Sequence, residues 1–277
     1  MLIPFEGPLN LSHTLGCGQA FRWRQEGDWY LGTVGGFALK VRVKGRTLEA
    51  RSNSPLSPGQ LSSYFRLEDD LDEIYDSIAV DDHIRVAIRR YRGLRLLRQQ
   101  PWECLASYII SIASNIPRIS ATIERISERY GNRLRLEAWE THSFPSPGAL
   151  ARAGPRALRR LGLGFRARYL CSAAKAVQNG QLDFDELSKL SSGKAREELM
   201  ALAGVGPKVA DCVLLFSLGR LEVFPVDRWV RRAVERLFFN GKELTENSVR
   251  EWGMNRYGPF AGYAQQYLFH YIRHLGL

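Results

Sequence analysis

A glycine-rich turn between two apolar segments is the feature that most constrains this chain. In residues 199–219, LMALAGVGPKVADCVLLFSLG, apolar residues lead into Gly204, Val205 and Gly206, and Pro207 then begins a second apolar run. Proline favours the first position of a helix, and glycines permit a tight turn whose backbone amides lack covering side chains. Residues 199–218 therefore indicate a helical hairpin, and its amides form an anion site suited to a DNA phosphate. A plain αα-corner, in which glycine serves close packing, is the alternative.

Lys208 occupies the second position of the predicted second helix. The positive end of the helix dipole disfavours an ammonium group there, and partial desolvation adds to this effect. We therefore expect a neutral amine, which is a nucleophile of the kind that forms Schiff bases. The alternative is an exposed lysine that binds a phosphate.

Asp227 lies nineteen residues after this lysine and immediately precedes an amphipathic segment. A helix N-cap explains an aspartate at this position without further function. At the mouth of a cleft, the same carboxylate would also oppose the positive charge of a sugar cation in a transition state.

The composition favours a polyanionic partner. The formal net charge is +10, the pI is about 9.7 and 45% of the residues are hydrophobic, so the chain is basic and able to bury a core. No apolar run approaches the roughly 18 residues that a membrane span needs, and the first residues do not form a signal peptide. The four cysteines are far apart and the histidines lack metal-ligand spacing, so we expect reduced thiols in a cytoplasmic protein.

Periodicity divides the chain into a β-rich part and a helical part. The first fifty residues indicate strands: in FALKVRV, alternate residues from Phe37 to Val43 face one side. From about residue 58 the pattern is helical, with a buried helix from Trp102 to Ala113 and a helix that ends near Gly131. In a later helix, the pattern puts Trp229, Val230, Ala233, Val234 and Leu237 on the apolar face, opposite Arg228, Arg231, Arg232 and Glu235.

These patterns predict an α+β fold. A small antiparallel β-rich domain is expected over residues 1–95, followed by a mostly helical domain over residues 96–277. We expect a monomer.

The hairpin, lysine and aspartate together resemble the helix–hairpin–helix glycosylase superfamily, and within it the 8-oxoguanine DNA glycosylase family. The resemblance implies that Lys208 attacks C1′ of the sugar and that Asp227 supports this step. It extends over most of the chain through the stretches GQAFRWR (18–24), SYFRLEDDL (63–71), GLRLLRQQPWECL (93–105), LRRLGLGFRARYL (158–170), LAGVGPKVADC (202–212), FPVD (224–227) and YGPFAGYAQQYLF (257–269).

The resemblance also implies a pocket for a flipped base. Gly18 would offer its carbonyl to the protonated N7 that distinguishes 8-oxoguanine from guanine. Gln265 would contact the Watson–Crick edge and Phe269 would stack on the base. Cys212, one turn after the lysine, would line the opposite side, with Phe216 in the same pocket. Without the family, each of these residues is an ordinary core, turn or surface position.

Further positions are implied as DNA contacts. Asn115 and Arg118 would fill the gap in the duplex, while Phe165 and Arg166 would wedge into the opposite strand. The remaining expected contacts come from the hairpin and the later helix, at Gly204, Val205, Gly206 and Arg228. No cofactor is required, although the carbonyls of Met200, Leu202 and Val205 are a possible site for a cation that bridges to phosphate.

Three departures from the family pattern bear on how strictly the enzyme demands cytosine opposite the lesion. A run of asparagines is replaced by Ala113, Ser114 and Asn115. Phe165 replaces an expected tyrosine, and Trp229 replaces an expected histidine.

The expected function is repair of double-stranded DNA that contains 8-oxoguanine, by base excision and lysine-dependent strand cleavage. An alkylated-base glycosylase is one alternative, although its members usually lack the lysine. A non-enzymatic helix–hairpin–helix DNA-binding protein is another. The absence of a four-cysteine cluster argues against a thymine-glycol or adenine-mismatch enzyme.

Overall fold

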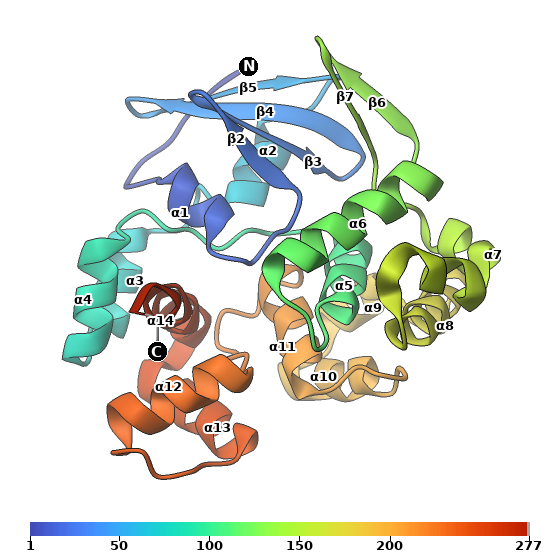
Figure 1. Ribbon diagram of the computed structural model, residues 1–277. Helices are drawn as coiled ribbons and strands as arrows, with labels where there is room; N and C mark the ends of the chain where they lie inside the picture. Colours follow the sequence, from blue (N-terminus) through green and yellow to red (C-terminus); the bar gives the residue numbers. More distant parts are fainter. Residues whose placement is uncertain (276–277) are drawn as a thin grey trace.

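The computed structural model describes residues 1–275, with a β-sheet at one end and a body of helices at the other (Figure 1). The sheet has five antiparallel strands in the order β1-β5-β4-β3-β2. The strands are Leu2–Pro4 (β1), Trp23–Glu26 (β2), Trp29–Val34 (β3), Phe37–Lys44 (β4) and Thr47–Ser52 (β5).

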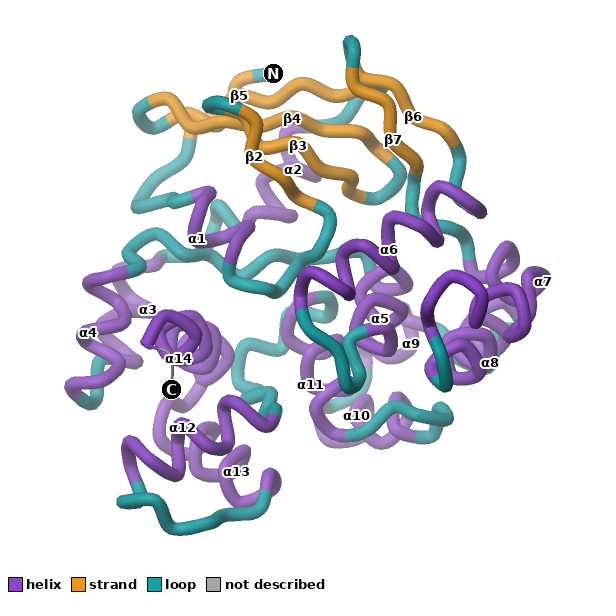
Figure 2. The backbone as a smooth tube through the Cα atoms, in the orientation of Figure 1, coloured by secondary structure: helices purple, strands orange, loops and turns teal. Residues whose placement is uncertain are grey.

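One face of the sheet is buried against two helices. Leu39 and Val41 of β4 are fully buried, as the alternation in FALKVRV predicts. They pack with residues of α1 (Leu11–Gly16) and α2 (Pro58–Phe65), which lie beneath the sheet in Figure 2. The helix α1 lies in a stretch where the sequence indicated only strands, and Asn10 caps it by accepting a hydrogen bond from the His13 amide.

The next two helices, α3 (Leu71–Ile78) and α4 (Asp82–Arg90), pack with the helical body. Their apolar residues belong to the larger core, which also contains residues of the last helix, α14 (Ala261–Leu275). Packing therefore joins residues 71–94 to the C-terminal helices, and the predicted division after residue 95 stays a prediction.

The buried helix at the centre of the body is α5 (Pro101–Ile110), as predicted, and it packs against α8 and α11. It ends three residues earlier than expected, because Ala113 adopts a left-handed φ of 49° and the chain turns. The following helix, α6 (Ile116–Tyr130), ends at Gly131 as predicted. The other helical segments are Pro147–Leu158 (α7), Arg159–Leu163 (η1), Arg166–Gln178 (α8), Phe184–Lys189 (α9), Ser192–Met200 (α10), Pro207–Phe216 (α11), Arg228–Phe238 (α12), Glu246–Tyr257 (α13) and Gly258–Phe260 (η2).

The structure corrects two sequence interpretations. A β-hairpin, β6 (Arg133–Leu136) and β7 (Trp139–His142), interrupts the part expected to be helical, and Glu137 at its turn pairs with Lys40 and Arg51 of the sheet. In α12, Glu235 is buried and accepts a hydrogen bond from the amide of Leu244, whereas Trp229, assigned to the apolar face, is 46% exposed.

The predicted α+β architecture is otherwise confirmed. All four cysteines are buried and free. Within residues 1–275, none of the helices is long and apolar enough to cross a membrane.

Candidate active site

The predicted hairpin is formed by α10 and α11. Gly206 is the N-cap of α11, Pro207 is its first residue and Lys208 its second, as the sequence predicts. Gly204 has a φ of +83°, and a Cβ there would lie 2.3 Å from the ring of Tyr169. Both the left-handed backbone and this close approach require glycine.

A buried ion pair joins the two hairpin helices. Arg196 of α10 donates from Nε to Oδ1 of Asp211 on α11 at 2.6 Å. Asp211 is only 1% exposed, and burial raises its pKa to about 6 although the arginine opposes the shift.

The turn between these helices holds the carbonyls proposed for a cation. The carbonyl of Leu202 accepts a hydrogen bond from the amide of Val205 at 3.0 Å, and Met200 is partly exposed. Within the described residues, no group of three or more His, Cys, Asp or Glu side chains is arranged to hold a metal. The backbone-carbonyl site stays a prediction.

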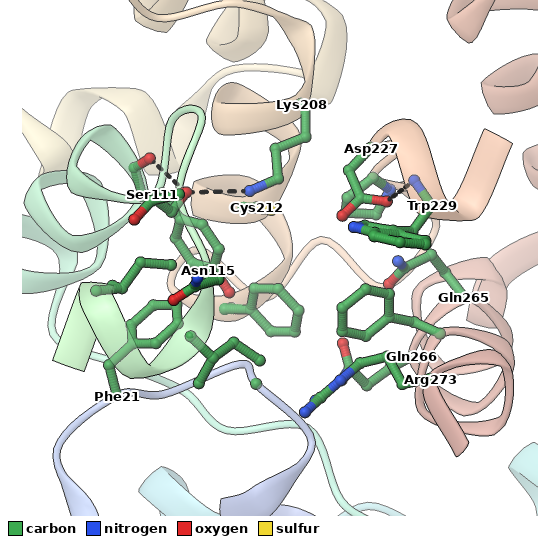
Figure 3. Close-up of a pocket in the computed structure, with 18 of the residues that line it drawn as sticks. Phe21, Ser111, Asn115, Lys208, Cys212, Asp227, Trp229, Gln265, Gln266 and Arg273 are labelled. Carbon is green, nitrogen blue, oxygen red and sulfur yellow. Dashed lines mark hydrogen bonds between the residues drawn. The ribbon is translucent and has the colours of Figure 1, made fainter. Parts of the chain in front are cut away.

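A cavity of about 530 Å³ opens beside the start of α11 (Figure 3). Its walls come from segments far apart in the sequence: the loop after α1, the α5–α6 connection, α11, the entry to α12, and α14. They bring together Lys208, Asp227, Gly18, Cys212, Phe216, Gln265, Phe269 and Asn115, together with Phe21, Tyr108, Ser111, Trp229, Gln266 and Arg273.

Lys208 points into this cavity and not into open solvent (Figure 3). Its Nζ lies 3.3 Å from Oγ of Ser111 and 4.7 Å from the centroid of the Tyr108 ring. Among the described residues, it forms no ion pair with Asp227 within 4.0 Å. The amine therefore rests against α5, across the cavity from the carboxylate.

Asp227 caps α12 and faces the cavity at the same time. Its Oδ1 accepts hydrogen bonds from the amides of Trp229 at 2.9 Å and Val230 at 2.8 Å. The capping role predicted from the sequence is thus confirmed, and the other carboxylate oxygen is turned toward the cavity (Figure 3).

Aromatic and thiol side chains form the floor of the cavity. Phe216 stacks on Tyr108 with ring centroids 5.7 Å apart and planes inclined by 11°. Burial raises the pKa of Cys212 to about 12. The thiol is therefore protonated and does not compete with the amine as a nucleophile.

The residues expected to bind the base converge on the other side. Gln265 is 5% exposed, and its Oε1 is buried without a hydrogen-bond partner within the described part of the chain. Gly18 has a φ of +90°, and a Cβ there would lie 2.8 Å from Ile116 and 3.6 Å from Phe269. A side chain at this position would fill the cavity, whereas glycine leaves the backbone accessible.

Most residues expected to contact DNA lie outside the core. Asn115 caps α6 by accepting a hydrogen bond from the Arg118 amide at 3.0 Å, and both residues are exposed. Phe165 is 49% exposed, which is unusual for so large an apolar side chain. Arg228 is also exposed and lies over the ring of Trp229.

Two family models cover most of the chain. The model described as 8-oxoguanine DNA glycosylase, N-terminal domain, matches residues 2–105, and the one described as HhH-GPD superfamily base excision DNA repair protein matches residues 106–257. The N-glycosylase/DNA lyase OGG1 of Arabidopsis thaliana is 32% identical, over 95% of this chain and 79% of that protein. The chain belongs to the 8-oxoguanine DNA glycosylase family.

Solved structures of this family superpose along the whole chain. MBOgg1, in complex with a low-affinity DNA ligand, has a TM-score of 0.95 and 35% identity, covering 100% of this chain and 96% of that one. The Clostridium acetobutylicum 8-oxoguanine glycosylase/lyase, in complex with double-stranded DNA containing cytosine opposite 8-oxoguanine, has a TM-score of 0.92 and 30% identity, covering 100% and 99%. The resemblance seen in the sequence is therefore confirmed.

Within this 8-oxoguanine glycosylase fold, Arg166 differs from its expected position as a wedge. It is 4% exposed, and its guanidinium donates to the carbonyls of Leu163 at 3.0 Å and Ile110 at 2.7 Å. Further hydrogen bonds reach the carbonyls of Ile112 and Gly162. The structure gives Arg166 a place inside the protein, and a role at the opposite strand stays a prediction.

Sequence reasoning missed two residues that touch the lysine of this glycosylase. Ser111 and Tyr108 belong to the apolar segment from Trp102 to Ala113, whose composition predicts a buried helix and assigns no role to their polar atoms. The available signal was the interval from Tyr108 to Ser111, which places both side chains on one face of a helix.

Proposed function

We propose that this protein excises 8-oxoguanine from duplex DNA and then cleaves the strand, with Lys208 as the nucleophile. The observation that carries the proposal is the amine at the start of α11, inside a cavity that also contains the Asp227 carboxylate. The relatives named as glycosylase/lyases and the family models support the same reaction class.

The damaged nucleotide enters the cavity by leaving the base stack. Eversion costs a few kcal/mol of unstacking, and the protein offsets part of this cost by filling the gap. Asn115 and Arg118 at the cavity rim fit this role, and the exposed Phe165 ring suits contact with the opposite strand. In the hairpin turn of Gly204, Val205 and Gly206, the amides of the two glycines are the ones suited to a phosphate, because the Val205 amide donates to the carbonyl of Leu202.

Residues of the inner wall of the cavity would recognise the lesion. The carbonyl of Gly18 accepts a hydrogen bond from the protonated N7, which unmodified guanine lacks. Gln265 would form hydrogen bonds with the Watson–Crick edge of the base. Its Oε1 is buried without a partner, and a donor on the base would satisfy it. Phe269 and Cys212 contact the two faces of the base, above Phe216.

The chemistry divides between the carboxylate and the amine. As the bond from C1′ to the base breaks, Asp227 stabilises positive charge on the sugar. The lone pair of Lys208 forms a bond to C1′, and the base leaves with the bonding electrons and is protonated. The amine then gives up one proton, and its lone pair opens the sugar ring by breaking the bond from C1′ to O4′. O4′ takes up a proton as a hydroxyl, and a protonated imine remains. Loss of the C2′ proton then expels the 3′ phosphate by β-elimination.

We expect a monomer that acts in the cytoplasm and is associated with the nucleoid if the cell is prokaryotic. Arg228 is available for a phosphate beside the α12 entry. The carbonyls of Met200, Leu202 and Val205 would hold a cation that bridges the hairpin to phosphate, and the chemistry itself needs no cofactor.

Borohydride trapping tests the proposal. The wild type is expected to form a covalent adduct on a duplex with 8-oxoguanine, and Lys208→Gln is expected to bind that duplex with unchanged affinity but form no adduct. No adduct with the wild type would contradict the imine step. A parallel duplex with 3-methyladenine tests the alkylated-base alternative, and pairing 8-oxoguanine with each of the four bases measures the opposite-base preference.

A further inference from the structure

Two side chains at the end of α5 hold the amine of Lys208 from one side. Ser111, the C-cap of α5, lies 3.3 Å from Nζ through its Oγ, and the Tyr108 ring lies beneath Nζ at 4.7 Å. The hydrogen bond to Ser111 fixes the distance of Nζ from one atom, and the Tyr108 ring keeps Nζ over one face. Because a lysine side chain is a flexible four-carbon stem, two such contacts restrict where its amine rests.

The hydroxyl of Ser111 has a defined direction. Its Oγ donates to the carbonyl of Tyr108 at 2.7 Å, so its proton is already committed. Ser111 therefore meets Lys208 as an acceptor, and the amine is the donor. The face of an aromatic ring likewise attracts N–H groups. Neither contact uses the lone pair of a neutral amine, which stays free for attack.

The Tyr108 ring is itself held firmly. Its hydroxyl donates to the carbonyl of Gln19 at 3.1 Å, and the ring packs against Phe216 on one side and the edge of Phe21 on another. Burial raises the pKa of Tyr108 well above its ordinary value, so the phenol stays neutral. The ring is a rigid platform and the hydroxyl is its anchor.

The Tyr108 hydroxyl is bonded to the loop that contains Gly18 and is expected to face the base. Gln19 directly follows Gly18, and its backbone carbonyl also accepts from the Gln99 side chain at 2.7 Å. One tyrosine therefore touches both the segment assigned to lesion recognition and the amine assigned to chemistry.

We propose that Ser111 and Tyr108 are positioning residues that hold the Lys208 amine for attack on C1′, and that the Tyr108 hydroxyl fixes the Gly18 loop relative to that amine. This inference rests on the proposed function. A displacement of about 1 Å from an attack geometry costs on the order of 10²-fold in rate, which sets the size of the expected effects.

An abasic-site duplex separates chemistry from base recognition, because imine formation there needs the amine but no base. In single-turnover borohydride trapping, Ser111→Ala is expected to form the adduct about 10- to 100-fold more slowly, with unchanged duplex affinity. Ser111→Thr keeps a hydroxyl and restores most of the rate. The matched control is Ser188→Ala, since Ser188 makes the same 2.7 Å bond to a carbonyl three residues earlier, on distant α9. A wild-type rate for Ser111→Ala overturns the role of Ser111.

The two roles of Tyr108 need two variants. Tyr108→Phe keeps the ring, still packed on Phe216 and Phe21, and removes only the bond to Gln19. It is therefore expected to slow excision of 8-oxoguanine at least about tenfold more than it slows trapping of abasic DNA. Tyr108→Leu removes the platform and slows both reactions. If Tyr108→Phe changes neither reaction, or slows both equally, the tie to the Gly18 loop is overturned.

Folding and function are controlled separately. Circular dichroism and thermal unfolding verify each variant, and if Tyr108→Leu does not fold, the Ser111 series and Tyr108→Phe still decide. Failure of the wild type to form any adduct sinks the proposed function. A normal wild type with variants that trap equally fast sinks the positioning roles alone.

Discussion

Nε of Arg196 donates to Oδ1 of Asp211 at 2.6 Å, and this contact joins the helices on either side of the hairpin turn. Asp211 Oδ2 and Arg196 Nη2 have no partner within the described part of the chain, so the pair is incompletely satisfied. A buried ion pair of this kind adds little net stability. We expect the pair instead to set the angle at which the turn presents its amides.

The buried carboxylate makes stability depend on pH. Because the pKa of Asp211 is about 6 in the folded protein against an ordinary 3.8, folding favours the protonated form. Its contribution is fully present below the ordinary pKa and is lost as pH rises through about 6. Relative to Asp211→Asn, the wild type should lose about 2–3 kcal/mol between pH 4 and pH 7. Urea unfolding across this range measures the difference, and parallel curves for the two proteins would contradict it.

Asp227→Asn separates charge from capping. Asparagine caps a helix as well as aspartate does, so the melting temperature should change little. Loss of the negative charge should slow base release on the order of 10²-fold. The matched control is Asp183→Asn, because Asp183 caps α9 with the same pair of bonds to Oδ1, far from the cavity. Single-turnover excision is the measurement, and equal rates for both variants would reduce Asp227 to a cap.

Alanine substitutions of Arg166 and of its neighbour Phe165 should affect different properties: the first should lower stability and the second should lower DNA affinity. Arg166→Ala leaves buried carbonyls without donors and should lower the free energy of unfolding by at least about 2 kcal/mol. Phe165→Ala removes an exposed ring, so stability should stay within about 0.5 kcal/mol while affinity for lesion DNA falls. Denaturant unfolding and duplex binding test both. A fully stable Arg166→Ala that binds DNA poorly would restore the wedge role at this position.

Alanine substitutions of the two turn glycines, Gly204 and Gly206, should differ in how much they lower stability. Gly204→Ala places a methyl group against the Tyr169 ring at a left-handed φ and should cost more than about 1 kcal/mol. Gly206→Ala meets open space at a φ of −97°, so only the N-cap preference for glycine over alanine is lost and the cost should be smaller than for Gly204→Ala. Thermal unfolding compares the pair, and an equal loss in both would show that the Tyr169 contact is unimportant.

Local signals in the sequence predicted the elements that carry the candidate site. Pro207 after two glycines marks the start of α11, and Asp227 before an amphipathic run marks the start of α12. These signals act over one helical turn, so they do not depend on the rest of the fold. The family resemblance added the pocket positions.

Features that depend on distant contacts were missed. Glu235 follows the polar periodicity of its helix but is buried by the loop that contains Leu244. Leu134 and Leu136 do alternate with arginines, yet this four-residue strand becomes stable only through its partner and the sheet below it. Periodicity within one segment carries no information about which loop or strand will cover it.

The cavity has walls from both ends of the chain, from Gly18 to Phe269, so its assembly requires contacts that are far apart in sequence. Contacts of this kind form after the local hairpins, because closing long loops costs entropy. The pocket for a flipped base is therefore complete only after the last helix docks. A nascent or truncated chain without α14 has Lys208 but lacks the wall that Gln265 and Phe269 form.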